Sequence, residues 1–206
     1  MSKFAQIEPM DASPELKQAY GEARTQFGAV INLFKSVGSA PNVLKGILAL
    51  NKEINATTEL DTALIEQVAM LTSALNKCDY CVNVHMAVGR GAGLSKEALI
   101  QAMEAKAETP EAQALLNFTN EVIRNRGFAS DYTVNKAKAA GFSEKALLET
   151  IGIIGLYTTL QYIRHVADPE QDFPTVSEFD AIKHGANDDT LFVSDSTTTE
   201  TAGACA

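Results

Sequence analysis

The chain has 206 residues, of which 46% are hydrophobic and 21% charged, a balance typical of a folded globular protein. Its formal net charge of -9 would repel phosphate backbones, so we expect no nucleic-acid partner. No apolar stretch reaches the roughly 18 residues that a membrane-spanning helix needs, and the first residues contain no apolar signal segment. We therefore expect a soluble, cytoplasmic protein without a membrane partner.

The first helix is expected between Pro14 and about Phe27. Ser13 before it is a favoured N-cap, Pro suits the first helical position, and Gly28 can end the helix. Apolar residues repeat with the helical period in seven further stretches. They cover about 42–54, 62–75, 78–90, 95–105, 111–126, 132–140 and 143–165. No segment alternates with a period of two, so the sequence predicts an all-α fold.

Two short segments, residues 93–100 and 141–148, are similar to each other. Each contains a glycine, then a large apolar residue, then a serine that can cap a helix. The similarity indicates either a duplicated helical unit or two helix starts of the same kind. A match this short does not separate the two interpretations.

The last residues, 187–206, are rich in Ser, Thr and Asp and contain few large apolar side chains. Such a composition cannot bury enough apolar surface to fold, so we predict a disordered tail, in which Cys205 is incidental. Residues 1–186 would then form one helical domain around a shared core. Three cysteines, of which two are close together, do not form the disulfide framework of a secreted protein.

The helix expected over 62–75 is apolar on nearly all faces, so it should be buried on nearly all sides. Glu66 lies within it, and a buried carboxylate is costly unless it has partners. The break at Asn76 and Lys77 lets this helix and the next fold back on each other, with Asn76 as a cap for the second. Glu66 is therefore expected to approach residues of the following helix.

Cys78, Cys81 and His85 fall on one stripe of that following helix. Cysteines at positions i and i+3 can close a disulfide when their Cα atoms lie ~4.4–6.8 Å apart. A helix start stabilises a thiolate, which favours Cys78 as the more acidic thiol. His85 lies one turn after Cys81 and can bind its sulfur and take its proton. The opposite stripe should face solvent, and it carries Asp79, Asn83 and Arg90.

The spacing of Glu66, Cys78-Asp79-Tyr80-Cys81 and His85 resembles the signature of the AhpD-like alkylhydroperoxidases, within the carboxymuconolactone decarboxylase superfamily. Segments 28–34, 40–44, 139–143 and 165–166 also resemble peroxidase-related members, so the resemblance covers most of the chain. It implies an AhpD-like helical bundle that assembles as a homo-oligomer, a trimer or a hexamer. Two extensively apolar helices in one small domain also favour an oligomer.

The resemblance further implies a thiol-dependent peroxidase without a bound cofactor. Cys81 would attack the peroxide and become a sulfenic acid, and Cys78 would convert it to a disulfide. His85 and Glu66 would form a proton relay. A dithiol reductant, such as a lipoyl-bearing or thioredoxin-like protein, would then restore both thiols.

Other interpretations remain open. A zinc site formed by the two cysteines, His85 and Glu66 would lack the second Cys or His pair of most structural sites, so we expect no metal. A cofactor-free lactone decarboxylase or isomerase needs acid–base groups but no thiols. A non-enzymic, redox-responsive oligomer would turn over no peroxide. We expect His165 and Glu149, both on the helix at 143–165, to be structural.

Overall fold

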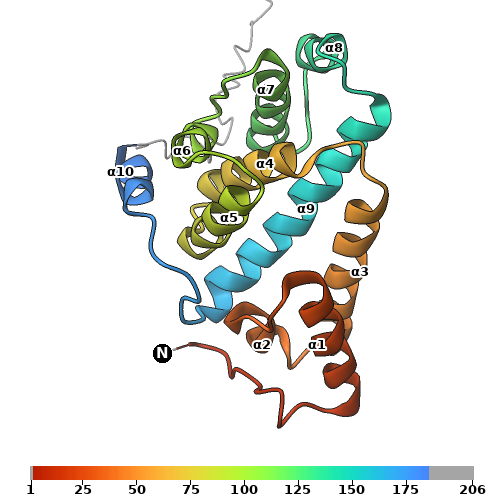
Figure 1. Cartoon of the computed structure of the whole chain (residues 1–206), viewed down its shortest axis with the longest axis vertical. Coiled ribbons are helices and arrows are strands. Elements are labelled where there is room, and N and C mark those ends of the chain that lie inside the picture. The colour runs from red at the N-terminus through yellow and green to blue at the C-terminus, as the bar shows by residue number, and fades with distance from the viewer. Residues whose placement is uncertain (1, 186–206) are drawn as a thin grey trace, which may run out of the picture.

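The computed structural model describes residues 2–185, which form ten α-helices and no strand (Figure 1). The prediction of an all-α fold is confirmed for this part of the chain. The predicted tail, 187–206, lies outside the described residues. In chain order the helices are α1 (Pro14–Phe27), α2 (Asn32–Val37), α3 (Pro41–Thr57), α4 (Thr62–Leu75), α5 (Asp79–Gly91), α6 (Lys96–Met103), α7 (Pro110–Arg124), α8 (Asp131–Ala139), α9 (Glu144–Ala167) and α10 (Ser177–Gly185).

Most helices begin where the sequence predicts, because a short polar side chain caps the first turn. The Ser13 hydroxyl accepts a hydrogen bond from the Leu16 amide at the start of α1, and Ser143 caps α9 in the same way. Such a cap contributes about 1 kcal/mol. Gly28 ends α1 in the left-handed conformation, with φ at 76°, which glycine adopts without steric cost.

The two similar segments start helices of the same local geometry. Gly93 and Gly141 both have positive φ, 92° and 109°, which accounts for glycine at each position. Ser95 and Ser143 follow and cap α6 and α9. A common turn geometry is therefore sufficient to explain the similarity.

The sequence did not predict α2 and α10. α2 has only six residues, and Ile31 at its N-cap position forms no side-chain capping bond. Helices this short are not stable on their own and depend on tertiary packing. In α2 this packing comes from the buried side chains of Leu33 and Phe34.

α4 is the central helix, and it contacts α5, α6, α7 and α9. Val68, Ala69 and Met70 in its middle are fully buried, as its apolar composition predicts. α9 crosses the molecule diagonally, with α8 near one end, α2 near the other and α3 packed alongside it (Figure 1). Because α5 packs directly along α4, the two helices that carry the candidate residues lie side by side.

α9 is long and apolar enough, by length and composition alone, to cross a membrane. This differs from our expectation that no stretch of the chain reaches that length. The helix nevertheless contacts α2, α3, α4 and α7, so it lies in the body of a helical domain, where the core helices of soluble proteins have the same composition. Part of its surface remains uncovered, at Leu148, Ile151, Tyr162 and Val166.

Candidate active site

The turn between α4 and α5 brings the two helices together. Lys77 adopts a left-handed conformation, with φ at 54°, and reverses the chain. Cys78, rather than Asn76 as we expected, caps α5: its sulfur accepts a hydrogen bond from the Cys81 amide at 3.3 Å. Asn76 instead ends α4, and its side-chain amide donates to Gln161 on α9 at 2.6 Å. The reason is that the Asn76 side chain forms its hydrogen bonds with residues of α9 rather than with the first turn of α5.

Cys78 and Cys81 are both free thiols and both buried. Burial raises the pKa of the Cys81 thiol well above its ordinary value, and the hydrogen bond and charge of Cys78 add to this effect. The positive charge of Arg164 acts in the opposite direction. At neutral pH the Cys81 sulfur therefore carries its proton, and a base must remove it before the sulfur can act as a nucleophile.

Glu66 and His85 form a buried pair between α4 and α5. The imidazole Nδ1 of His85 and the carboxylate Oε2 of Glu66 lie 2.9 Å apart. Glu66 is 4% exposed and His85 is 8% exposed. The sequence suggested that Glu66 approaches this stripe, and the structure shows the contact. With an ionised carboxylate the Nδ1 atom donates the hydrogen bond, which leaves Nε2 as the proton acceptor. The hydrogen bond of His85 that the structure shows runs to Glu66 rather than to the Cys81 sulfur.

Cys81 and His85 line one small hollow, which we call the cysteine cavity. Its volume is about 60 Å³, several times the ~10–15 Å³ that one water needs by the same measure. Its walls are mainly aromatic and aliphatic. The lining residues are Phe27, Ile31, Leu33, Phe34, Tyr80, Cys81, Val84, His85, Tyr157, Leu160 and Gln161. Cys78 is not among them, so Cys81 is the thiol that a small molecule in this cavity meets.

A larger hollow of about 490 Å³, the outer groove, adjoins the cysteine cavity. The two share Phe27, Val84, His85 and Tyr157. The outer groove also has a polar part, which comprises Gln26, Asn51, Lys52, Asn55, Thr62 and Glu66. A molecule larger than hydrogen peroxide therefore has space beside the cavity, on the side of His85 and Tyr157.

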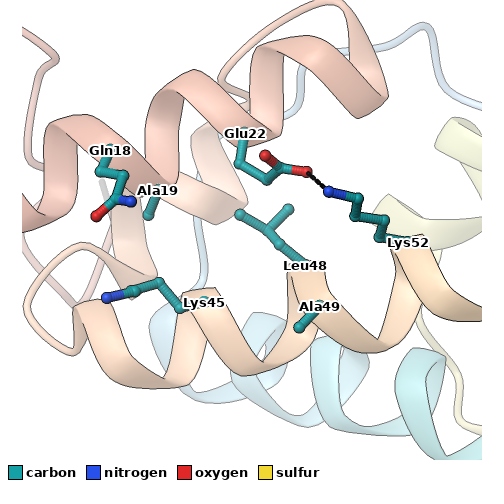
Figure 2. A pocket seen from close by; sticks show the side chains of 7 residues that line it. All are labelled: Gln18, Ala19, Glu22, Lys45, Leu48, Ala49 and Lys52. Atoms are coloured by element: carbon teal, nitrogen blue, oxygen red, sulfur yellow. Dashed lines mark ion pairs between the residues drawn. The ribbon is translucent and has the colours of Figure 1, made fainter.

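A third hollow, of about 210 Å³, lies between α1 and α3 (Figure 2). Figure 2 shows Glu22 of α1 directed toward Lys52 of α3, and their charged atoms are 3.7 Å apart. Gln18 and Lys45 lie further along the same hollow. Its lining contains no thiol, imidazole or hydroxyl, so we assign the chemistry to the cysteine cavity.

The face of α5 opposite the cysteines is covered only in part: Arg90 is exposed, as we expected, Asp79 is half-buried, and the expectation is wrong for Asn83. Asn83 is 3% exposed, and its side-chain oxygen accepts a hydrogen bond from the Val176 amide at 2.8 Å. Asp79 forms an ion pair with Arg164 at 2.9 Å. The physical reason is that the chain after α9, residues 168–176, folds back across α5; we call it the covering segment.

Tyr80, between the two cysteines, joins the covering segment to α2. Its hydroxyl binds the Asp172 carboxylate and accepts a hydrogen bond from the Leu33 amide at 3.4 Å. Burial raises the pKa of the Tyr80 phenol far above its ordinary value, and the bond to Asp172 adds to it. Tyr80 is therefore a neutral hydrogen-bond donor that fixes the first turn of α5.

His165 and Glu149 have the structural positions that we expected. His165 Nε2 lies 2.8 Å from the Asn76 carbonyl oxygen. The Glu149 carboxylate accepts hydrogen bonds from the Thr58 hydroxyl and the Glu59 amide, so it joins α9 to the loop before α4. Within residues 2–185 no three His, Cys, Asp or Glu side chains are grouped so that they could hold a metal ion.

Tyr157 is the residue of this site that the sequence did not reveal. Its ring contacts the His85 imidazole edge to face, with ring centres 4.6 Å apart. It lies on α9, far along the chain from the cysteines, among apolar residues that suggest only a core helix. No local signal marks it, because its position depends on how α9 crosses α4.

The model of the carboxymuconolactone decarboxylase family matches residues 41–121, a range that includes Glu66, Cys78, Cys81 and His85. No curated protein matches the sequence.

Solved structures with a similar fold match two thirds or more of this chain. An AhpD core, an uncharacterized peroxidase-related protein from Ralstonia eutropha, is 20% identical with a TM-score of 0.73, over 86% of this chain and 94% of that chain. A cysteine-to-alanine variant of the debrominase Bmp8 in complex with 2,3,4-tribromopyrrole is 18% identical with a TM-score of 0.71, over 90% and 97%. A putative antioxidant defence protein AhpD of Agrobacterium tumefaciens is 22% identical with a TM-score of 0.60, over 67% and 96%. These similarities establish the AhpD-like fold.

Proposed function

We propose that this chain, a member of the carboxymuconolactone decarboxylase superfamily with the AhpD-like fold, is a thiol-dependent peroxidase. The observation that carries the proposal is the cysteine cavity: Cys81 and His85 line it together, while Glu66 binds the imidazole from α4. A nucleophile, a base and a group that orients the base are the parts that an activated thiol requires.

The first step is activation of Cys81. Because burial raises the pKa of this thiol, its proton must pass to a base as the peroxide reacts. His85 Nε2 accepts the proton, and the Glu66 carboxylate stabilises the resulting imidazolium through Nδ1. The Cys81 sulfur then attacks the terminal oxygen of the hydroperoxide. The oxygen–oxygen bond breaks, Cys81 becomes a sulfenic acid, and the alkoxide leaves as an alcohol with the proton from His85.

The second step uses Cys78. Its sulfur lies one helical turn from Cys81 and already contacts the Cys81 amide. The Cys78 thiol attacks the sulfenic acid, a sulfur–sulfur bond forms, and one water leaves with the thiol proton. An external dithiol then exchanges with this disulfide and restores both thiols, so each cycle consumes one hydroperoxide and one dithiol. A lipoyl-bearing or thioredoxin-like protein fits this role. We propose that the enzyme works in the cytoplasm, without cofactor, as a homo-oligomer.

The test is hydroperoxide-dependent oxidation of dihydrolipoamide by the purified full chain, with Cys205→Ser as the background that leaves only the two buried thiols. Turnover should be lost in Cys81→Ser and in Cys78→Ser. An inactive wild-type protein with hydrogen peroxide, tert-butyl hydroperoxide and cumene hydroperoxide would contradict the proposal. Lactone decarboxylation that persists when both cysteines are replaced by serine would favour the other chemistry of the superfamily.

Reductive dehalogenation is a second candidate, favoured by the similarity of the fold to the debrominase Bmp8. The aromatic walls of the cysteine cavity and the adjoining outer groove suit a planar apolar ring. In this reaction the two thiols supply two electrons: the carbon–bromine bond is replaced by carbon–hydrogen, bromide leaves, and the cysteines end as a disulfide. Bromide release from a brominated pyrrole in the presence of dihydrolipoamide distinguishes this candidate from the peroxidase.

A further inference from the structure

Tyr157 lies where the cysteine cavity and the outer groove meet. Four residues line both, and among them only Tyr157 and His85 carry polar side-chain atoms. Tyr157 is held by the middle of α9, a long helix that packs on α4. The phenol is thus placed beside the imidazole by rigid elements of the fold rather than by a loop.

The hydroxyl of Tyr157 is free to bind a substrate. In the described part of the chain it forms no hydrogen bond, whereas the hydroxyls of Tyr20 and Tyr80 are bound to Ile7 and Asp172. In this part of the chain, the fully buried side-chain atoms that lack a hydrogen-bond partner are Thr119 Oγ1 and Arg164 Nε. The Tyr157 hydroxyl oxygen is not among these fully buried atoms. The protein therefore leaves the Tyr157 hydroxyl without a hydrogen-bond partner, at a residue that lines both hollows.

The surroundings of Tyr157 keep the phenol in its neutral form. Burial raises its pKa far above the ordinary value, and the negative charge of Glu66 adds to this effect. A neutral phenol is a hydrogen-bond donor, and it retains its proton next to a developing anion. His85, by comparison, has Nδ1 engaged by Glu66 and uses Nε2 for the proton of Cys81.

We propose that Tyr157 is a further catalytic residue, whose O–H donates a hydrogen bond to the oxygen that leaves when Cys81 attacks the hydroperoxide. The proposal rests on the proposed peroxidase function. As the oxygen–oxygen bond breaks, its electron pair moves to the departing alkoxide oxygen. Tyr157 stabilises that charge without losing its proton, and the proton of the alcohol comes from His85. A fixed donor directed at developing charge is effective in a cavity with apolar walls.

The test is Tyr157→Phe, which keeps the ring against His85 and removes only the donor. Removal of one such donor typically costs on the order of 10²-fold in rate. We expect a loss of that order in the oxidation of Cys81 by tert-butyl hydroperoxide, whose alkoxide is a poor leaving group. With peracetic acid the loss should be several-fold at most, because acetate leaves with little assistance. The pH profile of Cys81 alkylation should be unchanged. Tyr132→Phe, at an exposed tyrosine on α8, is the matched control.

The ratio of the two rates on one preparation does not depend on the folded fraction, so the comparison holds even if Tyr157→Phe is less stable. A selective loss with tert-butyl hydroperoxide supports the donor role. Equal losses with both peroxides, or rates equal to those of the wild type, would overturn it. If the wild type itself reacts with neither peroxide, the proposed peroxidase function fails. If the wild type is active and the Tyr157→Phe variant is equally active, only the role of Tyr157 fails.

Discussion

The carboxylate of Glu66 on α4 and the imidazole of His85 on α5 are 2.9 Å apart in the interior of the domain. The contact fixes the ring and selects which nitrogen can accept a proton. Tyr157 from α9 covers the same ring, so three helices determine its orientation. This pair makes Cys81, which burial would otherwise leave as an inert thiol, a candidate nucleophile.

Replacement of Glu66 by glutamine separates a catalytic role from a structural one. If the carboxylate supports proton transfer, Glu66→Gln should fold normally and lose about 10²–10⁴-fold in peroxide turnover. Glu149→Gln is the matched control, because Glu149 is a half-buried carboxylate with structural hydrogen bonds. It should lower the melting temperature and keep the rate per folded subunit. If Glu66→Gln instead lowers the melting temperature and keeps the rate per folded subunit, the role of Glu66 is structural.

The two cysteines should differ in the oxidation product that peroxide leaves on each when the other is replaced by serine. In Cys78→Ser, peroxide should leave a sulfenic acid on Cys81, which dimedone traps and mass spectrometry detects. In Cys81→Ser the same treatment should leave Cys78 largely unmodified, because Cys78 does not line the cysteine cavity. A dimedone adduct on Cys78 in Cys81→Ser would instead assign the attack to the thiol at the N-cap.

The reactivity of Cys81 should depend on pH in a definite direction. Burial raises its pKa, so the folded protein favours the protonated thiol. Without peroxide, alkylation of Cys81 by iodoacetamide should be slow at pH 7, with a midpoint above the ordinary value of about 8.5. A midpoint below pH 8 would show that a thiolate exists before the peroxide binds.

The same shift predicts a loss of stability in alkali. A thiol whose folded pKa lies above its unfolded pKa contributes its full stability below about pH 8.5, and this contribution is lost as pH rises toward the folded pKa. The free energy of unfolding of the reduced protein should therefore fall more steeply above pH 9 than that of Cys81→Ser. Chemical denaturation at several pH values measures both slopes, and parallel slopes would contradict the prediction.

The uncovered face of α9 predicts self-association. Leu148, Ile151, Tyr162 and Val166 are all at least 45% exposed on this one helix, and exposed apolar side chains that recur along one helix face are typical of an interaction site. Sedimentation should give a mass that is a multiple of 22.1 kDa. Leu148→Lys should shift the population toward the monomer, while Met10→Lys, at an exposed residue of the N-terminal segment, should not. A wild-type monomer at micromolar concentration would exclude the oligomer.

Much of this architecture could be predicted from local patterns. Ser13 and Ser143 marked helix starts, and the short break after Leu75 was sufficient to expect Glu66 near the stripe of Cys81 and His85. The sequence did not reveal Tyr157 or the burial of Asn83. Both depend on contacts between segments that are distant in the chain, and neither residue differs locally from an ordinary core or surface residue of a helix.

The sulfur of Cys78 also caps α5, which has a consequence for the reduction potential of the pair. In the dithiol form this sulfur accepts the Cys81 amide hydrogen bond, and a disulfide sulfur is a poorer hydrogen-bond acceptor than a thiol sulfur. Whatever stabilises the reduced form relative to the disulfide makes the pair more oxidising. We therefore expect the disulfide to be reduced readily by mild dithiols, with a potential above that of typical structural disulfides of about -300 mV. Equilibration in glutathione buffers measures it, and a disulfide that persists in strongly reducing buffer would rule this out.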